Sequence, residues 1–152
     1  MKPQQTTIAE VSLIYRSKVK ASDRSQVKCS KDAYDLFMER WDKNTLEHVE
    51  EFKVLLMNRS NAVSGIMDVS KGGISGTVTD VRLIYQAAIK ANASGIIACH
   101  NHPSGNINPS ESDTKLTQKI KEAGLLMDIQ LLDHLILTID DIYYSFADNG
   151  LL

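Results

Sequence analysis

Two histidines and an aspartate lie close together in the stretch HNHPSGNINPSESD, residues 100 to 113. His100 and His102 are two residues apart, a spacing that puts both imidazoles on the same side of an extended backbone. Asp113 follows after a loop of small polar residues. Two neutral imidazoles and one carboxylate supply three of the four usual ligands of zinc, and catalytic zinc sites leave the fourth position to water. The pattern therefore indicates a metal centre that could carry out hydrolysis.

Hydrolysis at such a centre requires an activated water and a base. Zinc lowers the pKa of a bound water from about 15.7 towards about 7, which makes hydroxide available at neutral pH. A nearby side chain must then take up the proton and return it. Glu50 and Glu51, at the start of an apolar segment, are the nearest candidates along the chain. The residue pattern alone leaves both open.

The elements on either side of this stretch would position the three ligands. Residues 94–100, SGIIACH, form a short apolar run typical of a buried strand, and open α/β sheets commonly place their sites where such strands end. Ser110 is a helix N-cap candidate, Asp113 completes a capping box, and Gly124 is the expected C-cap of a helix over 109–124. Each signal is weak alone, because a capping box needs no metal, but together they favour a metal site.

The rest of the chain alternates strands and helices. We expect helices over residues 30–42 and 80–92, and strands over 8–16, 50–58 and 62–70, the last two forming a hairpin; three short strands follow near 126–132, 134–139 and 142–146. Asp133 and His134 flank a junction between two of these strands, either as a polar turn with a packed histidine or as groups that lie in the cleft or support the metal ligands from behind. The order predicts the α/β class, with one mixed β-sheet flanked by helices.

Composition places the chain among ordinary globular proteins. Its 152 residues suit a single domain over 1–152, with residues 1–6 as a flexible N-terminus. The formal net charge of -2 favours neither nucleic acid nor membrane surfaces. Only residues 16–28, with five basic side chains and one acidic, leave a weak polyanion contact open. No signal peptide or membrane-spanning run is present, and Cys29 and Cys99 fit no metal or redox spacing, so we expect a cytoplasmic protein with reduced thiols.

The motif resembles that of a known family. HNHPSG followed by PSESD is similar to the JAMM signature of the MPN/JAB metallohydrolases, H-x-H-P, a spacer and S-x-x-D, and most closely to its RadC branch. The segments EEFKVLLMNRSNAV, GGISGTVTDVRLIYQAAIKANASGIIACHNHPSG, LLDHLIL and YYSFADNG also resemble RadC proteins, so the likeness spans roughly residues 7–152. Longer RadC proteins carry a helix-hairpin-helix-like segment before this domain. The printed sequence lacks that segment, so we expect none of its DNA contacts.

The resemblance implies a cytidine-deaminase-like fold, the JAB/MPN domain, with a Zn2+ ion as cofactor. The implied zinc ligands are His100, His102 and Asp113. Ser110 is implied to stabilise the tetrahedral oxyanion as a fixed hydrogen-bond donor.

The resemblance also implies a general base. The family glutamate stands in an E-x-x-G-x-L pattern, which corresponds to EEFKVL and places it at Glu50. Lys53 replaces the glycine of that pattern, so Glu51 remains the alternative.

The leading functional hypothesis is a zinc-dependent hydrolase of amide bonds, a peptidase or isopeptidase acting on a protein or peptide. Two histidines and a carboxylate also bind iron in non-haem oxygenases. A deaminase would require the P-C-x-x-C motif, which is missing, and an HNH nuclease spreads its residues along a ββα element. The alternative from another class is a non-catalytic accessory domain, DNA-repair-associated or protein-binding, that keeps a metal site. Edge strands could also pair between chains in a homo-oligomer.

Overall fold

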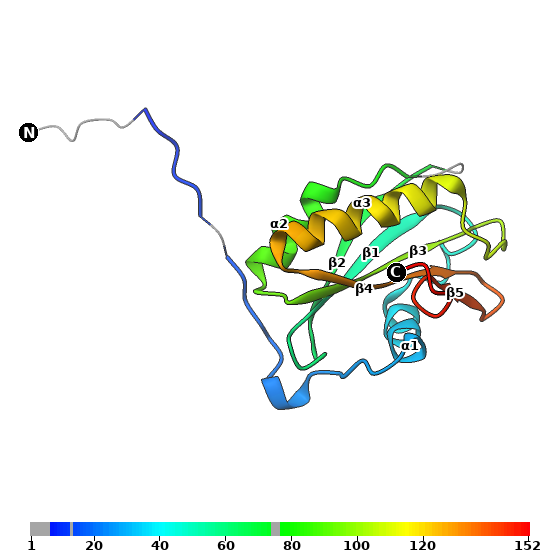
Figure 1. The fold of residues 1–152 in the computed structure, drawn as a ribbon, viewed down its shortest axis with the longest axis horizontal. Helices are drawn as coiled ribbons and strands as arrows, with labels where there is room; N and C mark the ends of the chain where they lie inside the picture. The colour runs from blue at the N-terminus through cyan, green and yellow to red at the C-terminus, as the bar shows by residue number, and fades with distance from the viewer. Residues whose placement is uncertain (1–6, 13, 74–76) are drawn as a thin grey trace, which may run out of the picture.

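A five-stranded mixed sheet forms the centre of the molecule (Figure 1). The computed structural model describes residues 7–12, 14–73 and 77–152. The sheet order is β2-β1-β3-β4-β5, and the strands are β1 (Glu51–Met57), β2 (Val63–Lys71), β3 (Gly95–Asn101), β4 (Gln130–Leu137) and β5 (Tyr143–Ser145). β3 and β4 run parallel, whereas the other neighbours are antiparallel. The α/β class and the predicted hairpin of β1 and β2 are confirmed.

Helices cover both faces of the sheet. Helix α1 (Ser30–Arg40) packs on one face, and α2 (Val81–Lys90) and α3 (Glu111–Met127) pack on the other; a short 3-10 helix, η1 (Ala21–Asp23), precedes α1. Every residue of β1 and β3 is buried, as expected for central strands covered on both sides. We call the two sides the α1 face and the α3 face. Because successive side chains of a strand point to opposite faces, neighbouring residues of β1 and β3 enter different environments.

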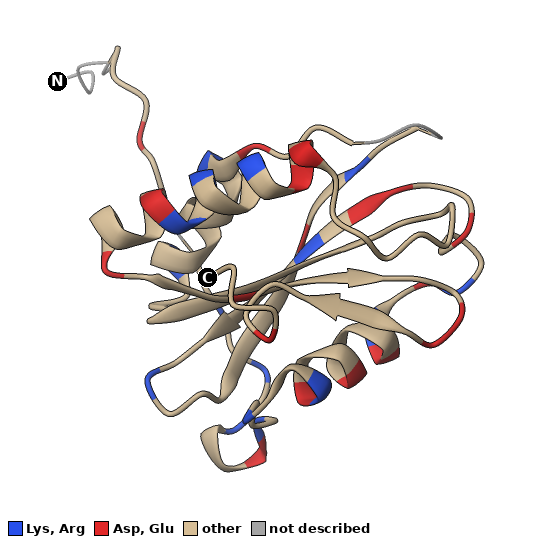
Figure 2. Ribbon diagram, turned by 45° about the vertical axis from the view of Figure 1, so that its right-hand side comes forward, with Lys and Arg blue, Asp and Glu red and all other residues tan. Residues whose placement is uncertain are grey.

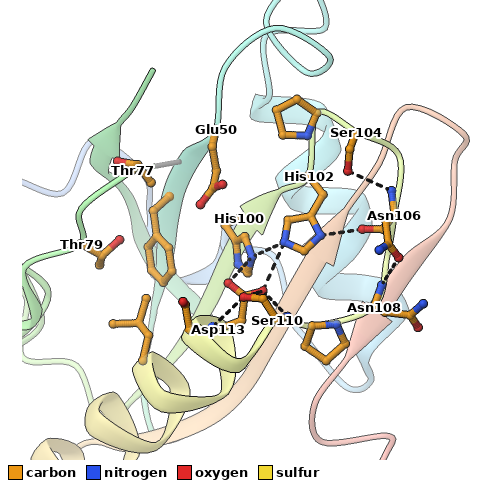
Figure 3. A pocket seen from close by; sticks show the side chains of 15 residues that line it. Glu50, Thr77, Thr79, His100, His102, Ser104, Asn106, Asn108, Ser110 and Asp113 are labelled. Atoms are coloured by element: carbon orange, nitrogen blue, oxygen red, sulfur yellow. Dashed lines mark hydrogen bonds and ion pairs between the residues drawn. The ribbon is translucent and has the colours of Figure 1, made fainter. Parts of the chain in front are cut away.

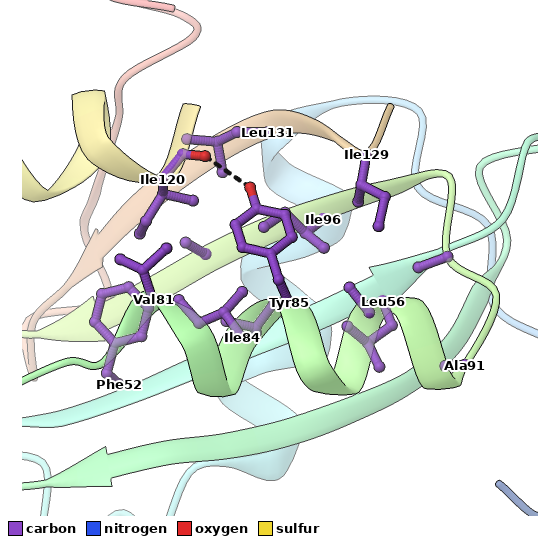
Figure 4. Close-up of a cluster of buried hydrophobic side chains, with 14 residues drawn as sticks. Phe52, Leu56, Val81, Ile84, Tyr85, Ala91, Ile96, Ile120, Ile129 and Leu131 are labelled. Carbon is purple, nitrogen blue, oxygen red and sulfur yellow. Dashed lines mark hydrogen bonds between the residues drawn. The ribbon is translucent and has the colours of Figure 1, made fainter. Parts of the chain in front are cut away.

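The core of the α3 face depends on a close contact between α2 and α3 (Figure 4). The buried Tyr85 hydroxyl donates a hydrogen bond to the Ile120 carbonyl oxygen at 2.7 Å. A Cβ atom on Gly124 would lie 2.3 Å from the Ile129 carbonyl oxygen and 2.7 Å from the Tyr85 hydroxyl. The prediction of Gly124 as the C-cap is therefore wrong. The helix continues to Met127 and ends at Asp128 in the left-handed conformation, and the glycine instead allows the two helices to approach.

The predicted strands over 126–132 and 134–139 are in fact one strand. Residues up to Met127 belong to α3, and β4 then runs without a break from Gln130 to Leu137. At the expected junction the strand shows only a shift in register, opposite Ile96 and Ile97 of β3. The Asp133 carboxylate accepts hydrogen bonds inside the fold, from the Ser145 hydroxyl at 2.6 Å and the Ala147 amide at 3.0 Å. The third predicted strand is confirmed as the shorter β5.

The predicted strand over residues 8–16 is wrong for the residues that the structure describes. They form an extended arm outside the sheet (Figure 1), and residue 13 and the predicted flexible residues 1–6 lie outside the described part. Ile8 and Val11 are 84% and 82% exposed. Apolar alternation favours a strand only where a neighbouring strand offers its backbone groups, and here Tyr15 makes a single side-chain contact with β2, to the Ser64 carbonyl oxygen.

Charges of both signs are interspersed along α1 and α3 (Figure 2). Both helices carry lysines among aspartates and glutamates, so neither presents a face of one sign. Within the described ranges, no helix has the length and apolar character needed to span a membrane.

Candidate metal centre

The structure brings the three predicted metal ligands together (Figure 3). His100 lies near the end of β3, His102 follows the strand, and Asp113 lies in the first turn of α3. The Nε2 atoms of the two histidines are 3.0 Å apart. The Asp113 carboxylate completes the triangle, with Oδ1 3.2 Å from His100 Nε2 and Oδ2 3.3 Å from His102 Nε2. The strand end and the helix start thus converge as the sequence predicted.

The orientation of His102 is fixed by the loop that follows it. Its Nδ1 atom lies 2.5 Å from the Asn106 carbonyl oxygen. Because a carbonyl oxygen can only accept a hydrogen bond, Nδ1 carries the proton, and the neutral ring directs the Nε2 lone pair towards His100 and Asp113. Burial favours a lower pKa for His102, but the nearby Asp113 carboxylate and the hydrogen bond to the Asn106 carbonyl oxygen outweigh burial and raise the pKa.

The Asp113 carboxylate is held in its anionic form at the start of α3. Ser110 donates to Oδ2 from its backbone N–H and its hydroxyl, both at 2.7 Å, and its Oγ accepts from the Asp113 amide at 3.1 Å. The predicted capping box is confirmed. Burial favours a higher pKa for Asp113, but the close contacts with His100 and His102 outweigh it, together with the Ser110 backbone N–H, and hold the pKa well below the usual range.

A chain of hydrogen bonds reaches His100 from the side away from His102. His100 Nδ1 lies 2.8 Å from His134 Nε2, and His134 Nδ1 lies 2.6 Å from the Thr117 hydroxyl. The Thr117 hydroxyl in turn donates to the Asp113 carbonyl oxygen at 2.6 Å. His134 is fully buried, and this burial lowers its pKa well below the ordinary value. His134 is therefore neither part of a turn nor part of the pocket wall; it lies behind His100 and contacts its Nδ1 atom.

The cluster fits a metal ion. Around a tetrahedral zinc, bonds of about 2.0–2.2 Å separate neighbouring ligand atoms by roughly 3.3–3.6 Å. The two Nε2 atoms are 3.0 Å apart, each lies 3.2–3.3 Å from a different oxygen of Asp113, and one ligand atom from each of the three residues lies within 4.8 Å of the others. Among the described residues, no lysine or arginine forms an ion pair with Asp113. Groups that direct lone pairs at a common point repel one another unless a cation lies between them, so the donor set suits a divalent metal.

The cluster opens into a pocket of about 580 Å³. Glu50, in the loop before β1, lines this pocket and points its carboxylate towards the histidines (Figure 3). Phe52 also lines the pocket, and its ring stacks on His100 with centroids 5.9 Å apart. Glu50 and Phe52 share a face because they are two residues apart on an extended backbone.

Glu51 points the other way, into the α1 face. Its carboxylate lies 3.1 Å from Lys53 Nζ and 3.4 Å from Lys71 Nζ, and it accepts a hydrogen bond from the Thr45 hydroxyl at 2.6 Å. Burial favours a higher pKa for Glu51, but the contacts with Thr45 and Lys53 outweigh it and lower the pKa. Of the two acids that the sequence left open, only Glu50 lines the pocket. Lys53, which stands where the family pattern has a glycine, also points into the α1 face, away from the pocket.

Sequence reasoning missed Asn101, which anchors the loop that carries Glu50. The Asn101 side-chain oxygen accepts from the Glu51 amide at 2.7 Å, and its amide group donates to the carbonyl oxygens of Leu46 and Val49 at 2.8 and 2.9 Å. The only signal in the sequence is its place between the two histidines, where alternation turns it to the opposite face. Thr117 was also missed, because a threonine inside a helix carries no signal for a site.

Comparison with known proteins identifies the family. The RadC-like JAB domain family matches residues 27–151. A UPF0758 protein of Flavobacterium johnsoniae is 47% identical over 126 residues, covering 83% of this chain and 53% of that protein. UPF0758 proteins of Porphyromonas gingivalis and Clostridium beijerinckii are 50% and 37% identical, covering 68% and 98% of this chain and 45% and 63% of those proteins. The chain thus spans about half the length of such relatives, and it belongs to the RadC-like JAB domain family.

Proposed function

We propose that the chain is a zinc-dependent hydrolase that cleaves amide bonds in a protein or peptide substrate. The observation that carries this proposal is the convergence of His100, His102 and Asp113 at a pocket that Glu50 also lines. Membership of the JAB family supports the same type of chemistry. His100, His102 and Asp113 would hold the zinc ion, which supplies Lewis acidity and makes a neighbouring water acidic enough to act near neutral pH.

Glu50 is the proposed general base and acid. Its carboxylate points into the pocket from the side of β1, across from Asp113 on α3. It takes a proton from the water as the water oxygen bonds to the amide carbon. It then delivers this proton to the amide nitrogen as the carbon–nitrogen bond breaks, so that an acid and an amine leave the site.

Ser110 is the proposed donor to the oxyanion that forms on the carbonyl oxygen. Its hydroxyl lines the pocket and donates to the Asp113 carboxylate at 2.7 Å in the structure. Because a hydroxyl rotates about a single bond, it can turn from the carboxylate to the substrate oxygen when that oxygen becomes negative. Its backbone N–H still caps Asp113 in that arrangement.

The pocket lining supports an uncharged polar substrate such as a peptide. Hydroxyl, amide and apolar groups line it, and the described lining residues include no lysine or arginine. Besides Ser110, the residues with hydroxyl or amide side chains are Thr77, Thr79, Ser104, Asn106, Asn108 and Ser112. Such groups form hydrogen bonds with a peptide backbone, whereas phosphodiester sites generally place arginine or lysine next to the phosphate. This lining favours amide over phosphodiester hydrolysis.

Glutamine substitutions at the two neighbouring acids test the proposal. Zinc-loaded wild type is incubated with a proteome-derived peptide mixture, and new peptide termini are identified by mass spectrometry. We expect cleavage by wild type and by Glu51→Gln. Glu50→Gln should retain its zinc but lose roughly 10²–10⁴-fold in rate, the usual size of a general acid–base contribution. Equal rates for Glu50→Gln and wild type, or no cleavage by fully loaded wild type, would refute the assignment.

A further inference from the structure

The direction of every hydrogen bond behind His100 can be assigned from chemistry. The Thr117 hydroxyl has one proton, and the Asp113 carbonyl oxygen, 2.6 Å away, can only accept it. Thr117 Oγ1 must therefore accept from His134, whose Nδ1 lies 2.6 Å away. A neutral His134 with its proton on Nδ1 has an unprotonated Nε2, which accepts from His100 Nδ1 at 2.8 Å. The remaining nitrogen of a neutral His100, Nε2, is then left with its lone pair facing His102 and Asp113.

We propose that Thr117 and His134 are positioning residues that hold His100 in the tautomer protonated on Nδ1, so that Nε2 is free to bind a metal. The tautomer itself requires no metal, whereas its use in hydrolysis rests on the proposed function. The chain of hydrogen bonds runs from His100 through His134 and Thr117 to Asp113. Asp113 therefore takes part twice, because its carboxylate lies in the cluster and its carbonyl oxygen accepts from Thr117.

The His134 ring is packed between two aromatic side chains. Its ring stacks on Phe146, with centroids 5.0 Å apart and planes 10° apart, and Phe52 packs against it at 5.4 Å. The His134 carbonyl oxygen also accepts a hydrogen bond from the Phe146 amide at 3.0 Å. A flipped ring would place carbon atoms against Thr117 and His100 and leave buried polar groups without partners, which native proteins rarely tolerate.

Loss of the Thr117 hydroxyl would remove the constraint on this tautomer. His134 could then carry its proton on Nε2 and donate it to His100 Nδ1. His100 would in turn carry its own proton on Nε2, at the position where a metal must bind. A change at Thr117, a residue outside the proposed ligand set, is therefore expected to weaken metal binding.

The test compares two threonines on α3. The Thr114 hydroxyl makes the same kind of helical hydrogen bond, to the Ser110 carbonyl oxygen at 3.1 Å, but is exposed. Thr117→Val removes the contact with His134, Thr114→Val is the matched control, and Thr117→Ser restores the hydroxyl. The first readout is the tautomer of each of the four histidines, taken from proton–nitrogen correlations of metal-free, ¹⁵N-histidine-labelled protein at about pH 8, above the ordinary histidine pKa of about 6.5. The second readout is zinc affinity, measured by competition with a chelator.

We expect His100 to be protonated on Nδ1 in wild type, Thr114→Val and Thr117→Ser, and to shift towards Nε2 in Thr117→Val. Zinc affinity should fall about 10–100-fold in Thr117→Val alone, the usual effect of losing an outer-shell partner. An unchanged tautomer and affinity in Thr117→Val would overturn the proposal. If wild type shows the expected tautomer but binds no zinc, the proposed function fails while the assignment of Thr117 and His134 stands.

A second pair of variants guards against misfolding of Thr117→Val. His134→Gln keeps an oxygen that can accept from His100 Nδ1, whereas His134→Leu offers no acceptor. Zinc affinity close to that of wild type in the glutamine variant, with a loss in the leucine variant, supports the positioning role. Equal losses in both, at equal folded fractions by circular dichroism, would show that the ring matters for packing alone and would overturn the proposal.

Discussion

Two clusters of ionisable side chains lie at the same end of the sheet, on opposite faces, and only one is neutralised by its own residues. On the α1 face, Glu51 is paired with Lys53 and Lys71, and Lys53 also contacts Asp68 at 2.6 Å and the Trp41 ring at 4.9 Å. On the α3 face, His100, His102 and Asp113 meet with no lysine or arginine paired to Asp113 among the described residues.

The difference follows from strand alternation, which directs neighbouring side chains to opposite faces of the sheet. Glu50 and Glu51 are adjacent in the sequence, yet one lines an open pocket and the other a buried ion-pair network. The α1-face cluster balances its own charges, so we expect it to stabilise the fold and to bind no metal ion. The cluster of His100, His102 and Asp113 has no lysine or arginine partner among the described residues, and under the proposed function a zinc ion would supply the missing positive charge. The predictions below separate these two roles.

The largest effect is expected when zinc is added to the α3-face cluster. A ligand present at about 1,000 times its Kd stabilises the folded state by about 4 kcal/mol. Wild type and Glu51→Gln should both gain this free energy of unfolding, measured by urea denaturation with zinc and with excess EDTA. Asp113→Asn should gain almost none. A gain in Asp113→Asn equal to that of wild type would show that zinc binds elsewhere.

Removal of a cation from the α1-face cluster is expected to cost less free energy and to leave metal binding unchanged. Lys53→Met leaves the buried Glu51 with only Lys71 as a cationic partner. Breaking a buried ion pair of this kind should lower the free energy of unfolding by roughly 2–4 kcal/mol. The matched control is Lys31→Met, because the Lys31–Asp35 pair is more than half exposed and should contribute less than about 1 kcal/mol. A loss of zinc affinity in Lys53→Met would contradict the separation of the two clusters.

Ser110→Ala tests the residue that serves both structure and the proposed chemistry. Loss of its side-chain cap should lower the free energy of unfolding by about 1 kcal/mol, which thermal denaturation can detect. Zinc content should stay close to that of wild type, because the backbone N–H still holds Asp113. The neighbouring exposed Ser112→Ala is the control and should change stability by less than about 0.5 kcal/mol. Equal stability of the two variants would rule out a capping role.

The last prediction concerns the packing that holds α3 in place. Burial raises the pKa of Tyr85 to about 12, whereas an unfolded tyrosine ionises near about 10. Between these values the unfolded state has released the proton and the folded state retains it, so stability falls as pH rises from about 10 to about 12. Stability curves should show this fall in wild type and in Tyr15→Phe, and a smaller fall in Tyr85→Phe. An identical fall in all three would contradict the assignment to Tyr85.

The sequence alone predicted the fold class, the hairpin and the convergence of His100, His102 and Asp113, because these depend on local patterns. Alternation put His100 and His102 on one side, and the capping box placed Asp113 at a helix start. The role of Gly124 could not be predicted, because it depends on a close contact with segments distant along the chain or beyond the helix. The arm over residues 8–16 was predicted wrongly, because its conformation depends on whether a neighbouring strand is present in the folded protein. The role of His134 likewise depends on β4 lying beside β3, a pairing that no local pattern specifies.

Zinc content by inductively coupled plasma mass spectrometry tests the central claim most directly. Tag-free wild type, Glu51→Gln and Asp113→Asn would be purified side by side. The account predicts about one zinc per chain in wild type and Glu51→Gln and essentially none in Asp113→Asn, because only the α3-face cluster lacks a cation of its own. The absence of metal from wild type after zinc loading, or equal zinc in all three proteins, would contradict it.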